Sequence, residues 1–235
     1  MKNKISFHLR ESASYFRRPR AMEMLVADHA AITRAAAILQ AGGTVAFPTD
    51  TVYGVGAQAF QPAAVEKLYA AKLRPRDKAI PLLLAQAADV ALVVREVSAD
   101  AQHLMARFWP GGLTLVLPRA ASVPDIVCAG GESVAVRLPA HAVAQALIAA
   151  VGAPLAATSA NLSGHPSPVV ATEVAAELAG RIDLILDGGR CPGGVSSTVL
   201  DLSGAQPRLL RAGAISVEEI EAVLGRRVGR VEVDK

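Results

Sequence analysis

The segment Phe47-Pro48-Thr49-Asp50-Thr51-Val52-Tyr53-Gly54-Val55-Gly56 follows the apolar run Thr44-Val45-Ala46 and precedes a helical pattern. We interpret it as a strand that ends in a polar turn, since two threonines, an aspartate and a tyrosine fall within five residues. Their side chains offer hydrogen-bonding groups, and Gly54 and Gly56 allow close approach of the backbone. Such a turn either holds a small polar ligand or satisfies only its own backbone, and the local chemistry leaves both readings open.

Strand and helix patterns alternate along the rest of the chain, with no repeat period and no long linker. The sequence therefore predicts a single α/β domain. Polar turns repeatedly follow apolar strands, which is where open α/β sheets hold their ligands. The expected helices span 28–41, 61–73, 98–108, 141–151 and 171–178, with a last one capped by Ser216 and Glu219. The expected strands span 44–46, 81–84, 113–117, 133–137, 154–158 and 182–186.

Composition and charge restrict the class of protein. Hydrophobic residues make up 52% of the chain and aromatic residues only 4%, so the core must consist mainly of Ala, Val and Leu. The net charge is +3, but residues 1 to 20 carry six Lys/Arg and one Glu, which leaves −2 on the remainder. Any attraction to nucleic acid must therefore come from this N-terminal tail or from a local cleft.

The N-terminal residues 1–24 are expected to be a disordered basic extension, which leaves 25–235 as the folded domain. A mitochondrial-type targeting segment and an RNA-contacting arm are the alternatives. We favour the extension because the segment contains no apolar core region and no clear helical face.

No membrane span is expected, since the most apolar segment, 142–157, is too short and contains Gln145, Gly152 and Pro154. Cys128 and Cys191 suggest neither a metal cluster nor a disulfide framework, which favours a reducing, cytoplasmic location. The histidines show no paired metal-ligand spacing, so we expect no structural zinc.

Several basic residues occur close together in Lys72-Leu73-Arg74-Pro75-Arg76-Asp77-Lys78. The sequence contains no Walker A motif, and the glycines at 54 and 56 match a dinucleotide fingerprint only weakly because a loop is expected after them. Converging cations can neutralise a polyphosphate, whereas a solvated charged loop is the structural alternative. Their proximity to the polar turn favours the first reading.

Two further features carry candidate binding groups. Arg137 ends an apolar strand, where an arginine commonly pairs with a carboxylate of the protein or of a ligand. Ser159-Ala160-Asn161-Leu162-Ser163-Gly164 forms a second polar turn after a strand. Without a Gly-x-Ser-x-Gly elbow, Ser159 and Ser197 are better read as hydrogen-bonding residues than as nucleophiles.

Six motifs in order resemble the YrdC-domain family of threonylcarbamoyl-AMP synthases: FPTDTVYGVG, KLRP, WPGGLTLVL, VAVRLPAH, TSANLSG and SSTV. The resemblance covers residues 30–213. It implies a single YrdC-like α/β domain, with a twisted mixed sheet, flanking helices and a concave, positively charged cleft. It also implies an enzyme, a nucleotidyltransferase that makes threonylcarbamoyl-AMP and pyrophosphate from L-threonine, bicarbonate and ATP, for threonylcarbamoyladenosine modification of tRNA.

The resemblance implies a role for individual residues. Magnesium is expected to arrive with ATP, with no protein ligand, and partners include tRNA and downstream modification proteins. The threonine-binding residues would be Thr51, Arg137, Ala157 and Ser197, and the nucleotide-binding residues would be Lys72, Arg74, Ser133, Ser159, Asn161, Ser167 and Arg211, with Lys72 and Arg74 also acting in catalysis.

Two departures from the family pattern bear on function. Many members have a histidine after the Lys-x-Arg-Pro motif, and we place Ala85 at that position, which removes one threonine contact. The chain ends shortly after Arg211, so we expect the short form without an additional C-terminal domain. An RNA-binding or regulatory paralogue without synthase activity, and a carbamoyl-transferring module acting on another amine, are the alternative functions.

Overall fold

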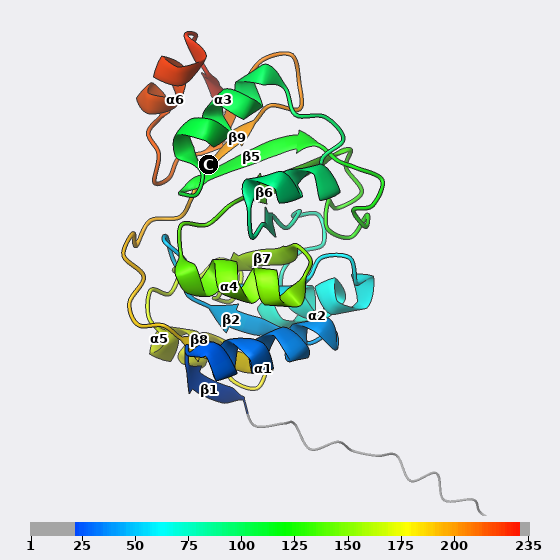
Figure 1. Ribbon diagram of the computed structural model, residues 1–235, viewed down its shortest axis with the longest axis vertical. Helices are drawn as coiled ribbons and strands as arrows, with labels where there is room; N and C mark the ends of the chain where they lie inside the picture. The colour runs from blue at the N-terminus through cyan, green and yellow to red at the C-terminus, as the bar shows by residue number, and fades with distance from the viewer. Residues whose placement is uncertain (1–21, 231–235) are drawn as a thin grey trace, which may run out of the picture.

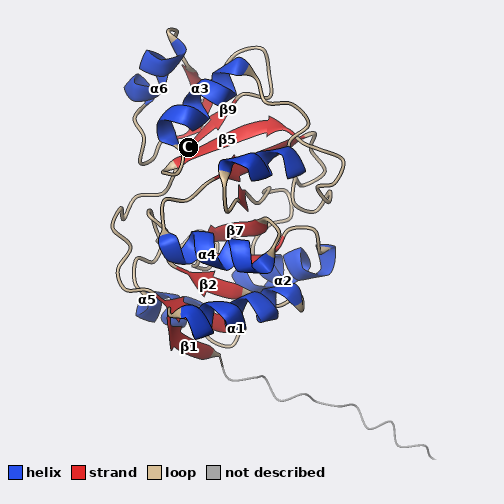
Figure 2. Ribbon diagram, in the orientation of Figure 1, coloured by secondary structure: helices blue, strands red, loops and turns tan. Residues whose placement is uncertain are grey.

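The computed structural model describes residues 22–230, which form six α-helices, one 3-10 helix and strands of a single sheet (Figures 1 and 2). The helices are α1 (His29–Gln40), α2 (Pro62–Lys72), η1 (Ala87–Leu92), α3 (Ala99–Phe108), α4 (Ala142–Val151), α5 (Ala171–Leu178) and α6 (Val217–Leu224). The strands are β1 (Glu23–Val26), β2 (Val45–Phe47), β3 (Gly54–Gln58), β4 (Leu82–Leu83), β5 (Leu113–Pro118), β6 (Ser133–Arg137), β7 (Leu155–Ser159), β8 (Leu184–Asp187), β9 (Thr198–Asp201), β10 (Arg208–Arg211) and β11 (Gly229–Arg230).

The strands form one mixed sheet in the order β1-β8-β2-β3-β7-β4-β6-β5-β9-β10-β11. Pairs such as β2 with β8 and β4 with β6 are parallel, whereas β3 with β7 and β5 with β6 are antiparallel. The predicted α/β fold, with a mixed sheet and flanking helices, is confirmed.

The helices cover the two faces of the sheet unequally. On one face, α1 and α4 pack together and bury Phe47, Leu155 and Leu184. The opposite face carries the larger core, to which α2, α3, α5 and α6 contribute side chains. Leu68 of α2, Leu104 of α3 and Leu115 of β5 belong to this core. Leu83 and Ala157 of the smaller core also line a cavity, which therefore lies on the same face of the sheet as α1 and α4.

Local sequence signals explain where the helices begin and end. Asp28 accepts a hydrogen bond from the Ala31 amide at the start of α1, as a capping aspartate should. At the start of α6, Ser216 and Glu219 form the predicted capping box. The last turn of α2 ends at Leu73, which has a left-handed backbone with φ of 51°.

The segment after the polar turn differs from the prediction. Gly54–Gln58 forms β3, antiparallel to β2, so the residues between Phe47 and Gly54 connect two paired strands instead of leading into a loop. A Cβ atom at Gly56 would lie 3.2 Å from both the Phe47 ring and the Ala156 carbonyl oxygen. The glycine therefore serves close packing inside the sheet, as glycines within strands often do.

The N-terminal boundary also differs, because β1 begins at Glu23, before the boundary predicted at residue 25, and pairs with β8. The predicted extension otherwise lies outside the described residues, so its nature stays a prediction. Helix η1 and strands β9, β10 and β11 also had no counterpart among the predicted elements. Between residues 22 and 230, none of the helices has both the length and the apolar character needed to cross a membrane.

Candidate functional site

A cavity of about 410 Å³ lies on the sheet face that α1 and α4 leave open. It crosses the middle of the sheet, since its walls come from β3, β7, β4, β6, β5, β9 and β10. The sequence-predicted residues that line it are Thr51, Arg74, Arg137, Ala157, Ser159, Ser197 and Arg211.

Arg137 borders this cavity and is held by three residues from two segments of the chain. Its Nε donates to the Gly111 carbonyl at 2.9 Å, its Nη1 to Thr51 Oγ1 at 3.0 Å, and its Nη2 to Asp50 Oδ1 at 2.5 Å. Burial lowers the pKa of Arg137, and the neighbouring Asp50 carboxylate opposes that shift. The guanidinium group is thus buried, paired and fixed in orientation, yet it still borders the cavity.

The polar turn holds itself together and also anchors other loops. Thr49 Oγ1 donates to the Val52 carbonyl at 2.6 Å and lies 3.0 Å from Thr51 Oγ1. The fully buried Tyr53 donates its hydroxyl to the Gly189 carbonyl at 2.8 Å. Tyr53, which the sequence left without a role, therefore ties the turn to the loop after β8.

Two further arginines face the same cavity. Arg74 braces its own loop, with Nε donating to the Lys78 carbonyl at 3.1 Å and Nη2 to the Ala79 carbonyl at 2.8 Å. Arg211 donates from Nη2 to the Ser197 carbonyl at 2.8 Å and to Ser197 Oγ at 3.0 Å. The pKa of Arg211 is lowered by burial and then by the charges of Arg137 and Arg74. The three guanidinium groups therefore lie close enough to repel one another, and a bound anion would reduce this repulsion.

Lys72 lies beside the cavity and not on its wall. Its side chain is 1% exposed, and its Nζ donates to the carbonyls of Ser159 and Asn161 at the end of β7. Burial, followed by the charge of Arg74, lowers the pKa of Lys72 from 10.5 to about 7. The lysine thus connects the last turn of α2 to the second polar turn, of which Ser159 borders the cavity.

The other predicted nucleotide-binding residues are not on the cavity wall. Asn161 is buried, with Nδ2 bonded to the Leu162 and His165 carbonyls and Oδ1 without a hydrogen-bond partner among the described residues. Ser133 and Ser167 are half-buried and absent from the residues that line the cavity.

The cavity wall also includes residues to which the sequence assigned no specific role. Thr49, Thr114 and Leu83 border the cavity. Ala85, at the position where we placed the family histidine, does not border it and packs instead near the cluster under α1 and α4. Leu83 is the β4 residue that faces the cavity and pairs with Arg137 in the β4–β6 ladder. The strand register places Leu83 beside Arg137, and this neighbourhood cannot be deduced from the motif spacing alone.

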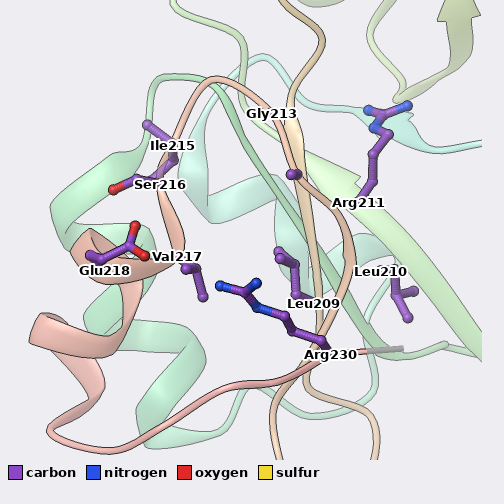
Figure 3. A pocket seen from close by; sticks show the side chains of 10 residues that line it. Leu209, Leu210, Arg211, Gly213, Ile215, Ser216, Val217, Glu218 and Arg230 are labelled. Carbon is purple, nitrogen blue, oxygen red and sulfur yellow. The ribbon is translucent and has the colours of Figure 1, made fainter. Parts of the chain in front are cut away.

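A second cavity of about 610 Å³ lies at the other side of β10, between that strand, α6 and Arg230 (Figure 3). Leu209 and Val217 point toward its centre, whereas Arg211 points away from it. Leu210 and Arg211 contribute to both cavities, so β10 forms a shared wall. The second cavity contains no other predicted site residue.

Within residues 22–230, no group of three or more His, Cys, Asp or Glu residues could hold a metal ion.

Known proteins resemble this chain closely. The sequence matches the Sua5/YciO/YrdC family, described as "Telomere recombination", over residues 37–213. It is 48% identical to the Threonylcarbamoyl-AMP synthase of Bacillus subtilis over 205 residues, which cover 87% of this chain and 58% of that protein.

Solved structures give the same relationship. The fold matches the crystal structure of Pyrococcus abyssi Sua5 complexed with L-threonine with a TM-score of 0.85 and 42% identity, over 90% of this chain and 62% of that chain. Escherichia coli YciO matches with a TM-score of 0.77 and 26% identity, over 86% of this chain and 99% of that chain. This chain thus spans little more than half the length of the Bacillus subtilis relative. Because the family match extends over most of the sequence, the resemblance predicted from the motifs is confirmed, and the chain belongs to the Sua5/YciO/YrdC family.

Proposed function

We propose that this protein is an L-threonylcarbamoyladenylate synthase, a nucleotidyltransferase that joins L-threonine, bicarbonate and ATP and releases pyrophosphate. The observation that carries the proposal is that Arg137, Arg74 and Arg211 border one cavity together with the hydroxyl groups of Thr51 and Ser197. The name of the Bacillus subtilis relative and the L-threonine bound in the Pyrococcus abyssi structure support this activity. The comparisons give no support to an RNA-binding paralogue without synthase activity.

Arg137 is the residue best suited to the carboxylate of threonine. An arginine donates five N–H groups in a fixed fork that matches a carboxylate. Three donors are bound to protein oxygens, which leaves two that have no partner among the described residues. Thr51 and Ser197 border the same space and would contact the polar groups of threonine.

Arg74 and Arg211 would hold the phosphates of ATP, with Lys72 and Ser159 at the adjacent edge. Mg²⁺ would arrive on the ATP phosphates, which commonly supply most of its non-water ligands. The bound ion would neutralise phosphate charge. Contacts of Ser133, Asn161 and Ser167 with the nucleotide stay predictions.

The reaction requires positioning and charge stabilisation, not a protein nucleophile. The threonine amine attacks the carbon of bicarbonate, and water leaves from the adduct to give a carbamate. A carbamate oxygen then attacks the α-phosphorus, the bond to the β-phosphate oxygen breaks, and pyrophosphate leaves. Fixed cations in a cavity can both align the reactants and stabilise the charge that develops on the phosphates. The product would serve tRNA modification, and contacts with tRNA and later modification proteins are part of this proposal.

Pyrophosphate release tests the proposal. The protein incubated with ATP, bicarbonate and Mg²⁺ should release pyrophosphate only when L-threonine is added. Pyrophosphate release that does not depend on threonine would contradict the assignment.

A matched pair of variants tests the role of the phosphate-binding arginine. Arg74→Ala should lower kcat/KM for ATP by roughly 10- to 100-fold, because it removes a charge-assisted contact to the phosphates. Arg76→Ala is the control, since Arg76 is two positions away but exposed and paired with Glu66. Equal losses in the two variants would show that Arg74 has no specific role.

A further inference from the structure

Asp50 has no role in the proposed reaction, yet it is the charged partner of Arg137. Its Oδ1 accepts from Arg137 Nη2 at 2.5 Å and from the Ala140 amide at 3.1 Å. Both side chains of the pair are largely buried, at 7% and 14% exposure. Asp50 itself does not border the cavity, whereas Arg137 and the adjacent Thr51 do.

The three anchors of Arg137 fix the plane of its guanidinium group. They come from the loop before β5 (Gly111), from the polar turn (Thr51) and from the same turn one residue earlier (Asp50). Asp50 is in turn held by the Ala140 amide, which lies just before α4. The carboxylate therefore cannot shift without moving the guanidinium, and the guanidinium cannot rotate without losing its anchors.

We propose that Asp50 is the positioning residue that orients the two free N–H donors of Arg137 toward the carboxylate of the amino-acid substrate. This inference rests on the proposed function. It goes further because it attributes the orientation of Arg137 to the geometry of the Asp50 hydrogen bonds and not to the charge of Asp50. A guanidinium that is tilted can no longer offer both donors to one carboxylate, and misplacement by about 1 Å can cost about 100-fold in rate.

Two variants separate geometry from charge. Asp50→Asn removes the charge but keeps an oxygen at the same position, and that oxygen can still accept from both Arg137 and Ala140. Asp50→Glu keeps the charge but adds a methylene group, which displaces the oxygen in a tightly packed site. Both variants keep an acceptor for the buried guanidinium group, so both are expected to fold.

The experiment is calorimetric titration of the full chain with L-threonine, and separately with ATP. Asp50→Glu should weaken threonine binding by about 10-fold or more, while Asp50→Asn should stay within about 3-fold of the unchanged protein. ATP affinity should stay within about 2-fold in both variants, a separation that a merely structural role would not produce. Asp125→Ala is the matched control, since Asp125 pairs with Arg119 at 2.6 Å but is 80% exposed and does not border the cavity.

The reverse order, with Asp50→Glu normal and Asp50→Asn weakened, would overturn the inference and leave the proposed function standing. Parallel losses of threonine and ATP affinity would also overturn it. Absence of threonine binding by the unchanged protein would overturn both the proposed function and the role of Asp50.

Discussion

Lys72 is a buried amine whose charge state should depend on the ligand. Its pKa of about 7 lies well below the ordinary 10.5, mainly because burial disfavours the ammonium form. Between these two pH values the unfolded chain binds more protons at this side chain than the folded chain does. The contribution of Lys72 to the free energy of unfolding therefore rises with pH across that interval.

Phosphate bound beside Lys72 should reverse this shift, because an anion favours the ammonium form. Binding of ATP at about pH 8 to 9 should then take up close to one proton. Calorimetric titration in two buffers of different ionisation enthalpy measures this uptake. Lys72→Arg is the control, since an arginine stays charged and has no proton to gain. Identical binding enthalpies in both buffers for the unchanged protein would contradict phosphate binding beside Lys72.

At the scale of elements, the loop after β10 crosses the start of β9 at very close range. The Ala214 amide donates to the Ser196 carbonyl at 3.0 Å, and Thr198 Oγ1 donates to the Ile215 carbonyl at 2.5 Å. A Cβ atom on Gly213 would overlap the Ser196 carbonyl oxygen and the peptide between Ser197 and Thr198. A glycine is therefore required where the two segments cross.

Gly213→Ala should destabilise the protein by about 1–3 kcal/mol, because the backbone atoms that it meets cannot move aside easily. It should also raise KM for ATP, since Arg211 is anchored to Ser197 in the segment that would be displaced. Urea unfolding and steady-state kinetics measure the two effects. Gly204→Ala is the matched control, because no heavy atom lies within 4 Å of a Cβ at that position. Equal stability of the two variants would contradict the close crossing.

Local signals in the sequence predicted most helices and strands. Asp28 begins α1 and Ser216 begins α6, because capping depends on residues next to each other in the chain. The pairing of β2 with β3 was missed because Gly54 and Gly56 weaken any strand signal. Both glycines are explained by their packing against the Phe47 ring and the backbone of β7. Strand β1 was missed because its neighbour β8 is far away in the sequence.

The candidate site shows the same division between local and distant information. The motifs supplied Thr51, Arg137 and Ser197, the family resemblance added Arg211, and the fold brings all four to one cavity. Asp50 and Arg137 are far apart in the chain, so the contact between them could be identified only from the structure.

At the scale of the whole molecule, two groups of elements meet across the two-residue strand β4. One group contains α1, α2, α4 and α5, and the other contains α3, α6, β5 and β9 (Figure 1). Strand β4 joins them by pairing with β7 on one side and β6 on the other. The cavity of about 410 Å³ has walls from both groups, so a ligand in it would connect them beyond what β4 provides.

Ligand binding should therefore stabilise both groups together. L-Threonine and ATP at 100 times their dissociation constants should each add up to about 2.7 kcal/mol to the free energy of unfolding. Hydrogen exchange should slow both in the turn at 49–53 and in β9 and β10, because the cavity takes residues from all of these segments. L-Threoninol, which lacks the carboxylate that Arg137 is proposed to bind, is the control ligand and should give little protection. Slower hydrogen exchange in only one group of elements would show that the ligands do not bind across both groups. Two thermal transitions, of which the ligands shift only one, would show the same.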